Sequence, residues 1–201
     1  MTDQERSSEY IDFTIPLEYF YPVLINVFFH QGPPTRDLLT REPWYFGTGF
    51  FYRIDGKNFL VTARHIFSAR TWRENKFRTD HQVAPTHIRI DVRGPQPAEG
   101  FDGGALPVNS VVLSLLDEDE KPLWIEHPEL THRLDVAALP LDGLIRTDQF
   151  HYMPIEPEPP HAATRFWVTQ DVFIVGFPLG LQHGYLWPLW IRGTVASEPA
   201  L

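Results

Sequence analysis

Cysteine is absent from the 201-residue sequence. Disulfide bonds and thiolate metal sites are therefore excluded, and packing and hydrogen bonding must stabilise the fold without covalent cross-links. Because a protein without cysteine does not need an oxidising environment, we expect a cytoplasmic location.

Positive charge and long apolar runs are also scarce. Seventeen Lys and Arg residues stand against 26 Asp and Glu, a net charge of −9, and the basic residues form no cluster. Nucleic-acid-binding proteins usually present a basic patch, so we expect no nucleic-acid partner. Met1 to Glu9 is polar and acidic, unlike a signal peptide. The apolar stretch Tyr19 to Phe29 is too short to span a bilayer and is broken by Pro22 and Asn26, so we expect no membrane partner.

The sequence does contain many short apolar runs. Hydrophobic residues make up 43% and aromatics 14%, a globular composition. Val, Ile, Phe, Tyr and Trp dominate the runs, and Gly, Pro, Asn and Asp separate them, which predicts an all-β fold of antiparallel strands. The expected strands are Val23 to Phe29, Tyr45 to Ile54, Asn58 to Thr62, His87 to Arg93, Ser110 to Leu116, Leu123 to Glu126, Val136 to Pro140, Val172 to Gly176 and Leu189 to Val195. The best helical candidate is a single turn at Ala63 to Ala69.

Turn residues divide the chain further. Asp55-Gly56 predicts a tight hairpin, because both residue types tolerate a positive φ, and the acidic run Asp117 to Pro122 predicts a solvated hairpin tip. Four prolines lie between residues 154 and 160, which favours an extended linker. We therefore divide the chain into an N-terminal extension (1–20), a first packing unit (21–150), a proline-rich linker (151–168) and the opening strands of a second packing unit (169–201).

Three motifs follow one another along the chain. Gly47-Thr48-Gly49-Phe50 precedes two strands, the second ending in Thr62-Ala63-Arg64-His65; Asp135-Val136-Ala137-Ala138 comes next, and then Val175-Gly176-Phe177-Pro178-Leu179-Gly180. In this order they resemble the GTGF, T-A-x-H, D-hydrophobic-A-hydrophobic and V-G-[YF]-P-x-G motifs of the trypsin-like serine peptidases. The resemblance implies a chymotrypsin-like fold of two antiparallel β-barrels, of which this chain supplies the first complete and the second only begun.

The resemblance also assigns roles to two residues. His65 would be the general base that takes the proton of a serine hydroxyl, and Asp135 would orient its ring and stabilise the imidazolium. We therefore expect a His65 ring nitrogen within hydrogen-bond reach of an Asp135 carboxylate oxygen. For Gly47 and Gly49 we expect a structural role, a bulge or a close backbone approach.

The nucleophile of such a triad is missing. None of the six serines (Ser7, Ser8, Ser68, Ser110, Ser114 and Ser197) stands in the G-x-S-G segment of the family. We expect this chain alone to be inactive, and its full-length form to be a serine endopeptidase whose serine lies beyond Leu201. A complementary C-terminal segment would then complete the second barrel, because an uncovered apolar edge invites aggregation. The alternative is a non-catalytic peptide-binding or regulatory relative that keeps the fold and two triad residues.

Metals and cofactors are not expected. His81 and His87, or His127 and His132, lack the cysteines or the H-E-x-x-H arrangement of zinc sites, and we interpret them as solvent-facing. The expected partner is a protein or peptide substrate. Cleavage preference and oligomeric state have no signal in the sequence.

Overall fold

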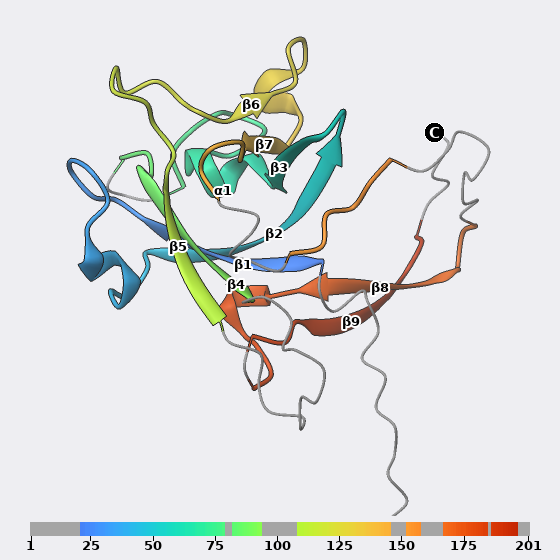
Figure 1. Ribbon diagram of the computed structural model, residues 1–201. Coiled ribbons are helices and arrows are strands. Elements are labelled where there is room, and N and C mark those ends of the chain that lie inside the picture. Colours follow the sequence, from blue (N-terminus) through green and yellow to red (C-terminus); the bar gives the residue numbers. More distant parts are fainter. Residues whose placement is uncertain are drawn as a thin grey trace, which may run out of the picture.

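The computed structural model describes residues 21–78, 82–93, 108–145, 152–157, 167–184 and 186–196. Two antiparallel sheets dominate it, and the all-β prediction is confirmed (Figure 1). The larger sheet contains, in spatial order, β5 (Val108–Ser114), β4 (His87–Arg93), β1 (Pro22–Phe28), β2 (Tyr45–Ile54), β3 (Lys57–Thr62), β7 (Ala137–Pro140) and β6 (Ile125–Glu126). The smaller sheet pairs β8 (Asp171–Gly176) with β9 (Leu189–Thr194).

Helical structure is short and local. The helix α1 (Arg64–Ser68) directly follows β3, as the sequence predicted. Three 3-10 turns complete the described elements: η2 (Arg36–Leu39), η3 (Thr131–Arg133) and η5 (Pro178–Gly180). Among the described residues, no helix combines the length and the apolar character that crossing a membrane requires.

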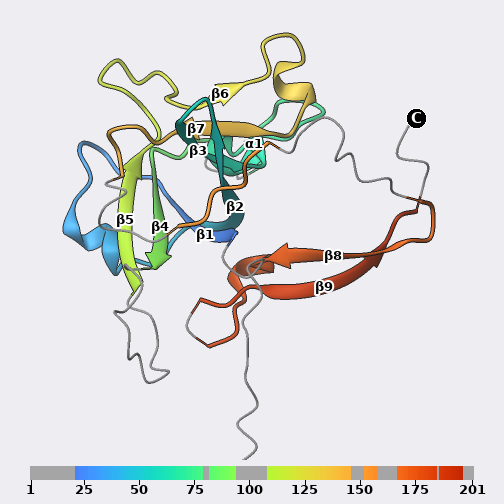
Figure 2. The same ribbon diagram turned by 45° about the vertical axis from the view of Figure 1, so that its right-hand side comes forward.

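The seven-stranded sheet curls around one hydrophobic core, as the two views of Figures 1 and 2 show. Alternate residues of the strands face inward, including Ile25 and Val27 of β1, Leu60 of β3 and Ile88 and Ile90 of β4, all fully buried. Within the described chain, β5 and β6 stand at opposite ends of this ladder, so the strands form a half-barrel. The described strands therefore support an all-β half-barrel, and the closed first barrel expected from the sequence stays a prediction. Within the part of the chain that the structure describes, the turn after β5 links the two ends, and Leu123 N–H there donates to Leu115 C=O at 2.9 Å.

One tight turn sets the pairing register of β2 and β3 at the centre of the larger sheet. Ile54 pairs with Lys57, and Asp55 and Gly56 between them have φ of 50° and 74°. Successive positive φ angles are what a two-residue hairpin turn needs, and Gly adopts them without a Cβ clash. The Asp-Gly prediction is thereby confirmed.

The β8–β9 hairpin rests against β2 through a very close contact of the Gly176 backbone with the Thr48 side chain. A Cβ on Gly176 would lie 2.9 Å from Thr48 Cγ2, so only glycine fits at this point. The next residue, Phe177, donates its N–H to Thr48 Oγ1 at 2.8 Å. The V-G-F-P-L-G and G-T-G-F motifs thus contact each other directly, although more than a hundred residues separate them.

Residues 152–157 lie in the stretch that the sequence predicted as a linker. Ile155 forms a parallel bridge with Tyr52 of β2, and its N–H and C=O bond to Phe51 C=O and Arg53 N–H at 2.8 and 2.9 Å. The Tyr152 ring packs on Phe51 with centroids 4.5 Å apart. This segment therefore covers the part of β2 that extends past β1.

Candidate functional site

His65 is the second residue of α1, one turn beyond the end of β3. Thr62 pairs with Ala137, which places the end of β3 beside the start of β7. Asp135 lies two residues before Ala137, so the strand register brings the beginning of α1 and Asp135 to the same edge of the sheet. The antiparallel pairing of β3 with β7 thus brings together His65 and Asp135, which lie 70 positions apart in the sequence.

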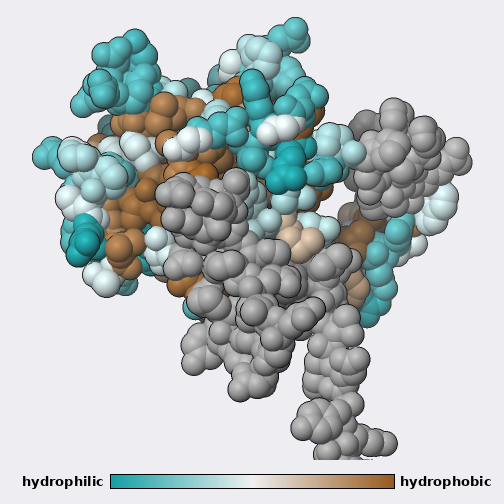
Figure 3. All heavy atoms as spheres, viewed as in Figure 1, coloured by the Kyte–Doolittle hydropathy of each residue, from teal (hydrophilic) through white to brown (hydrophobic). Residues whose placement is uncertain are grey.

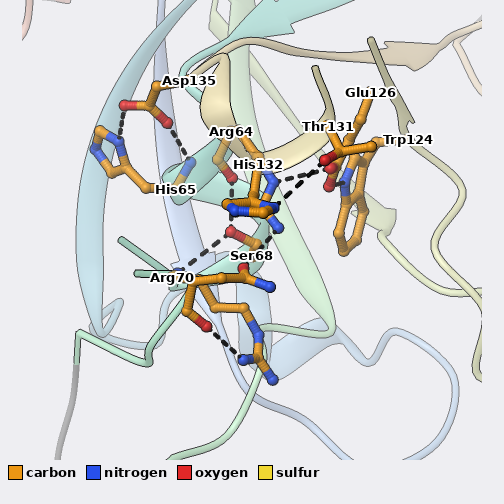
Figure 4. A network of polar contacts seen from close by, with 10 residues as sticks. Arg64, His65, Ser68, Arg70, Trp124, Glu126, Thr131, His132 and Asp135 are labelled. Atoms are coloured by element: carbon orange, nitrogen blue, oxygen red, sulfur yellow. Dashed lines mark hydrogen bonds and ion pairs between the residues drawn. The ribbon is translucent and has the colours of Figure 1, made fainter. Parts of the chain in front are cut away.

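Both oxygens of Asp135 contact His65 (Figure 4). Oδ1 accepts the His65 backbone N–H at 3.0 Å, and Oδ2 lies 2.7 Å from the ring Nδ1. The ring-to-carboxylate contact expected from the sequence is present. The two side chains are 26% and 29% exposed, so the pair is partly desolvated and still open to a ligand.

This contact decides the tautomer of the ring. An ionised carboxylate can only accept, so Nδ1 must carry the proton that points at Oδ2. In neutral imidazole the lone pair then belongs to Nε2. An imidazole held in this way has the arrangement that general-base catalysis needs: a basic Nε2 and a carboxylate that stabilises the charged ring once a proton has been taken up.

Gly47 allows α1 to lie close to β2. A Cβ at this position would come within 2.8 Å of Ile66 Cγ2. Tyr45, two residues earlier, donates its hydroxyl to Ile66 C=O at 2.9 Å, and burial raises the pKa of Tyr45, so the donor stays protonated. The close backbone approach expected for the glycines of this motif is therefore observed, and its consequence is a fixed position for His65.

Arg64, the neighbour of His65, is buried beneath the site (Figure 4). Its Nε lies 2.9 Å from Glu126 Oε2, and its Nη2 donates to Asn75 Oδ1 at 3.0 Å. Trp124 Nε1 donates to the other Glu126 oxygen at 3.0 Å. One guanidinium therefore ties α1 to β6, which opens the loop leading to Asp135, and to the loop that carries Asn75. Sequence reasoning missed this contact, and the only signal was an arginine inside an otherwise apolar segment.

Two surface hollows meet at His65. One, of about 600 Å³, is lined by the His65–Asp135 pair and by residues of the loop that follows α1, among them Trp72 and Arg78. The other, of about 490 Å³, is lined by His65, Arg78 and residues of β2 and α1, together with Leu179 of η5. Because His65 and Arg78 line both hollows, a ligand lying across them would pass the imidazole.

A serine hydroxyl is missing from this arrangement among the described residues. Ser68 is buried and donates to Arg64 C=O, Ser110 donates to Asp91, and Ser114 donates to Leu116 C=O. None of these contacts His65. Ser7, Ser8 and Ser197 lie outside the described residues.

The other histidines do not assemble a metal site in the described part of the chain, where no three His, Asp or Glu side chains are arranged to hold an ion. His127 Nδ1 accepts the N–H groups of Glu129 and Leu130 and so closes the turn after β6. His81 lies outside the described residues. His87, which the sequence placed in solvent, is only 3% exposed, so that prediction is wrong.

Comparisons of the chain with family models, with curated proteins and with solved structures found no match. The structure by itself defines an all-β protein with a curled antiparallel half-barrel. At one edge of that half-barrel a carboxylate orients a partly exposed histidine.

Proposed function

We propose that this chain carries the general base and the orienting carboxylate of a trypsin-like serine endopeptidase with two β-barrels. A segment beyond the 201 residues would supply the nucleophile and complete the second barrel. The observation that carries the proposal is the contact of both Asp135 oxygens with the amide and ring of His65.

The chemistry follows from the state of the ring. His65 Nε2 would take the proton of a serine hydroxyl as its oxygen bonds to the carbonyl carbon of a peptide. The imidazolium, stabilised by Asp135, would then give that proton to the leaving amine, so that an acyl-enzyme remains. Water would release the acid in the second half, with His65 again taking and returning one proton.

The smaller sheet supports the need for a further segment. Phe173, Ile174 and Ile191 of the β8–β9 hairpin are 56%, 63% and 44% exposed, and Leu181 beyond η5 is 57% exposed. Ile174 and Ile191 are paired on one face of the hairpin and Phe173 lies on the other. Large exposed apolar surface in a monomeric protein often marks a site where another segment or partner packs. Strands that pair and pack onto this hairpin would bury it and approach the hollow lined by Leu179 and His65.

The test begins with the gene. Its reading frame should continue past Leu201 and encode a G-x-S-G segment. The complete product should react with a fluorophosphonate probe, and His65→Ala should remove the labelling, whereas His183→Ala, on the exposed loop between β8 and β9, should keep it. A reading frame without such a serine, or equal labelling of the His65 variant, refutes the peptidase.

A non-catalytic peptide-binding protein is the second candidate. It is favoured by the observation that no described serine contacts His65, while two hollows meet at this residue. In that case the complete product would bind an extended peptide at the hollows without cleaving it. Asp135→Asn, which keeps the shape of the hollow wall, would leave this affinity unchanged.

A further inference from the structure

A third hollow, which we call the His87 hollow, lies apart from the His65 site. It has a volume of about 710 Å³. Residues 29–34 after β1, Thr86 and His87 at the start of β4, Ser114 and Leu116 at the end of β5, and Asp117, Glu118 and Glu120 of the acidic turn line it. None of these residues lines either hollow at His65. The loops after β1 and β5 project on the same side of the half-barrel in both ribbon views (Figures 1 and 2).

Hydrogen bonds fix the tautomer of His87. Thr86 Oγ1 lies 2.8 Å from the His30 N–H, 2.9 Å from the His30 C=O and 2.9 Å from His87 Nδ1. A hydroxyl has one proton and two lone pairs. The carbonyl can only accept, so the threonine proton goes to it, and Thr86 must accept from both the amide and the ring. His87 Nδ1 therefore carries a proton, and Nε2 is a lone-pair acceptor.

That acceptor has no hydrogen-bond partner among the described residues. His87 is only 3% exposed, and burial together with the nearby His30 lowers its pKa, which keeps the ring neutral. Buried acceptors are almost always paired with protein, water or ligand. A donor entering the hollow would supply the missing partner of Nε2.

The residues that line the hollow indicate which kind of hydrogen-bond donor it would bind. Phe29, Pro33, Pro34 and Leu116 give the hollow apolar walls, and Figure 3 shows hydrophobic surface bordered by hydrophilic loops on this side. Three carboxylates line the hollow, and no described Lys or Arg does. Asp117 Oδ1 is occupied by the N–H groups of Asp119 and Lys121, at 2.9 and 2.8 Å. Glu118 and Glu120 remain to attract a cation.

We propose that the His87 hollow binds a lysine side chain of a peptide or protein ligand. The aliphatic stem lies along the apolar walls, the ammonium donates one hydrogen bond to His87 Nε2, and Glu118 and Glu120 supply the compensating negative potential. Lysine fits better than arginine because a single deep acceptor would leave most of the five N–H groups of a guanidinium unpaired. Nε2 is covered in the free protein. The side chains that cover it must therefore move slightly outward when the lysine binds.

The experiment uses the 201-residue chain and nuclear magnetic resonance of its histidine ring nitrogens. Nα-acetyl-lysine methylamide is titrated against the norleucine analogue, which has a similar stem without the charge, and against the arginine analogue. Lysine should shift the His87 Nε2 signal toward that of a hydrogen-bonded nitrogen, with a Kd on the order of millimolar for so small a ligand. Norleucine should leave the signal in place, and arginine should bind more weakly than lysine.

Matched variants separate the hollow from general attraction to an acidic protein. Glu118→Gln with Glu120→Gln should weaken binding at least about fivefold. Asp119→Asn lies on the same turn, outside the lining and paired with Lys121 Nζ at 3.0 Å, and should change binding little. Equal shifts with lysine and norleucine, no shift at His87, or a larger loss in Asp119→Asn than in the glutamine pair would overturn the proposal. Because every variant keeps His65 and Asp135, the result does not depend on the peptidase proposal.

Discussion

Asp135 fixes His65 at two points, with Oδ1 on the backbone N–H at 3.0 Å and Oδ2 facing ring Nδ1 at 2.7 Å. A single contact would allow the carboxylate to pivot, whereas two contacts on one residue hold both α1 and the imidazole. The same aspartate is thereby a structural anchor of the first helical residues and a determinant of the ring tautomer. Substitutions at this position should separate these two effects.

Asp135→Asn should reverse one of the two contacts. The His65 N–H can only donate, whereas the ring can move its proton to Nε2. The amide oxygen should therefore accept the His65 N–H, and the NH2 group should donate to Nδ1, which then carries no proton. The Nδ1–H resonance of His65 should disappear, and the free energy of unfolding should fall by about 1 to 2 kcal/mol, less than for a fully buried group. Glu129→Gln, in the same loop and exposed, is the control. A resonance that survives in Asp135→Asn would contradict the tautomer assigned here.

Glu126→Gln should destabilise the fold by leaving the buried guanidinium of Arg64 without its anion. We expect a loss of about 2 to 3 kcal/mol in chemical denaturation, below the range for fully buried pairs because the Glu126 side chain is 26% exposed. The Nδ1–H signal of His65 should also shift, since α1 loses its tie to β6.

Glu74→Gln provides the comparison for this pair. Glu74 pairs with Lys76 at 2.7 Å but is fully exposed, and its removal should leave stability unchanged. Arg64→Met combined with Glu126→Leu should recover part of the loss seen in Glu126→Gln, because no charge is then left unpaired. A double variant less stable than the single one would argue against an unpaired charge as the cause.

Local sequence patterns predicted most of the strands. The predicted bounds of β2 and β4 coincide with the observed ones, because β-branched and aromatic runs between turn residues mark strand ends. β5 begins two residues earlier than predicted and ends two residues earlier. Leu115, just beyond it, still donates to Thr86 C=O next to β4, but its own C=O accepts from Leu123 in the following turn. Short-range patterns cannot separate the last ladder residue from the first turn residue.

Contacts between distant segments explain what the sequence could and could not predict at the sites. The sequence paired His65 with Asp135 because both stand in segments that resemble the motifs of one family; spacing alone would not have joined them. The ion pair of Arg64 with Glu126 and the burial of His87 depend on which strand faces which. His87 has a polar side chain at a strand start, which favours an exposed position; its burial and the edge contact with the His30 ring, 5.5 Å away, depend on the neighbouring loop.

Gly176→Ala should displace the β8–β9 hairpin from β2. The added methyl would lie 2.9 Å from Thr48 Cγ2, and the Phe177 N–H bond to Thr48 would be strained with it. We expect a loss of about 1 to 3 kcal/mol and faster proteolytic cleavage within β8 and β9. Gly193→Ala, on the same hairpin, meets only Val172 at an ordinary 3.8 Å and should not do so. Equal cleavage of the two variants would show that Gly176 is not a docking point.

Stability should fall as the solution is acidified through the titration range of histidine. Burial lowers the pKa of His87 from its ordinary value of 6.5, so the unfolded chain takes up a proton more readily than the folded protein. The stability that neutral His87 contributes is thus complete above pH 6.5 and is lost as the pH falls through the lowered pKa. His30, whose ring lies 5.5 Å away, opposes protonation, whereas the carboxylates of Asp117, Glu118 and Glu120 favour it.

His87→Phe isolates this contribution, because phenylalanine fills the same space without a titrating group. The variant should be less stable at neutral pH, since Thr86 loses the ring donor, but its unfolding free energy should decline less steeply between pH 7 and pH 5. His183→Gln, which alters an exposed histidine, should keep the slope of the parent protein. If His87→Phe follows the parent slope as well, the acid sensitivity arises elsewhere, and a buried neutral His87 is not its source.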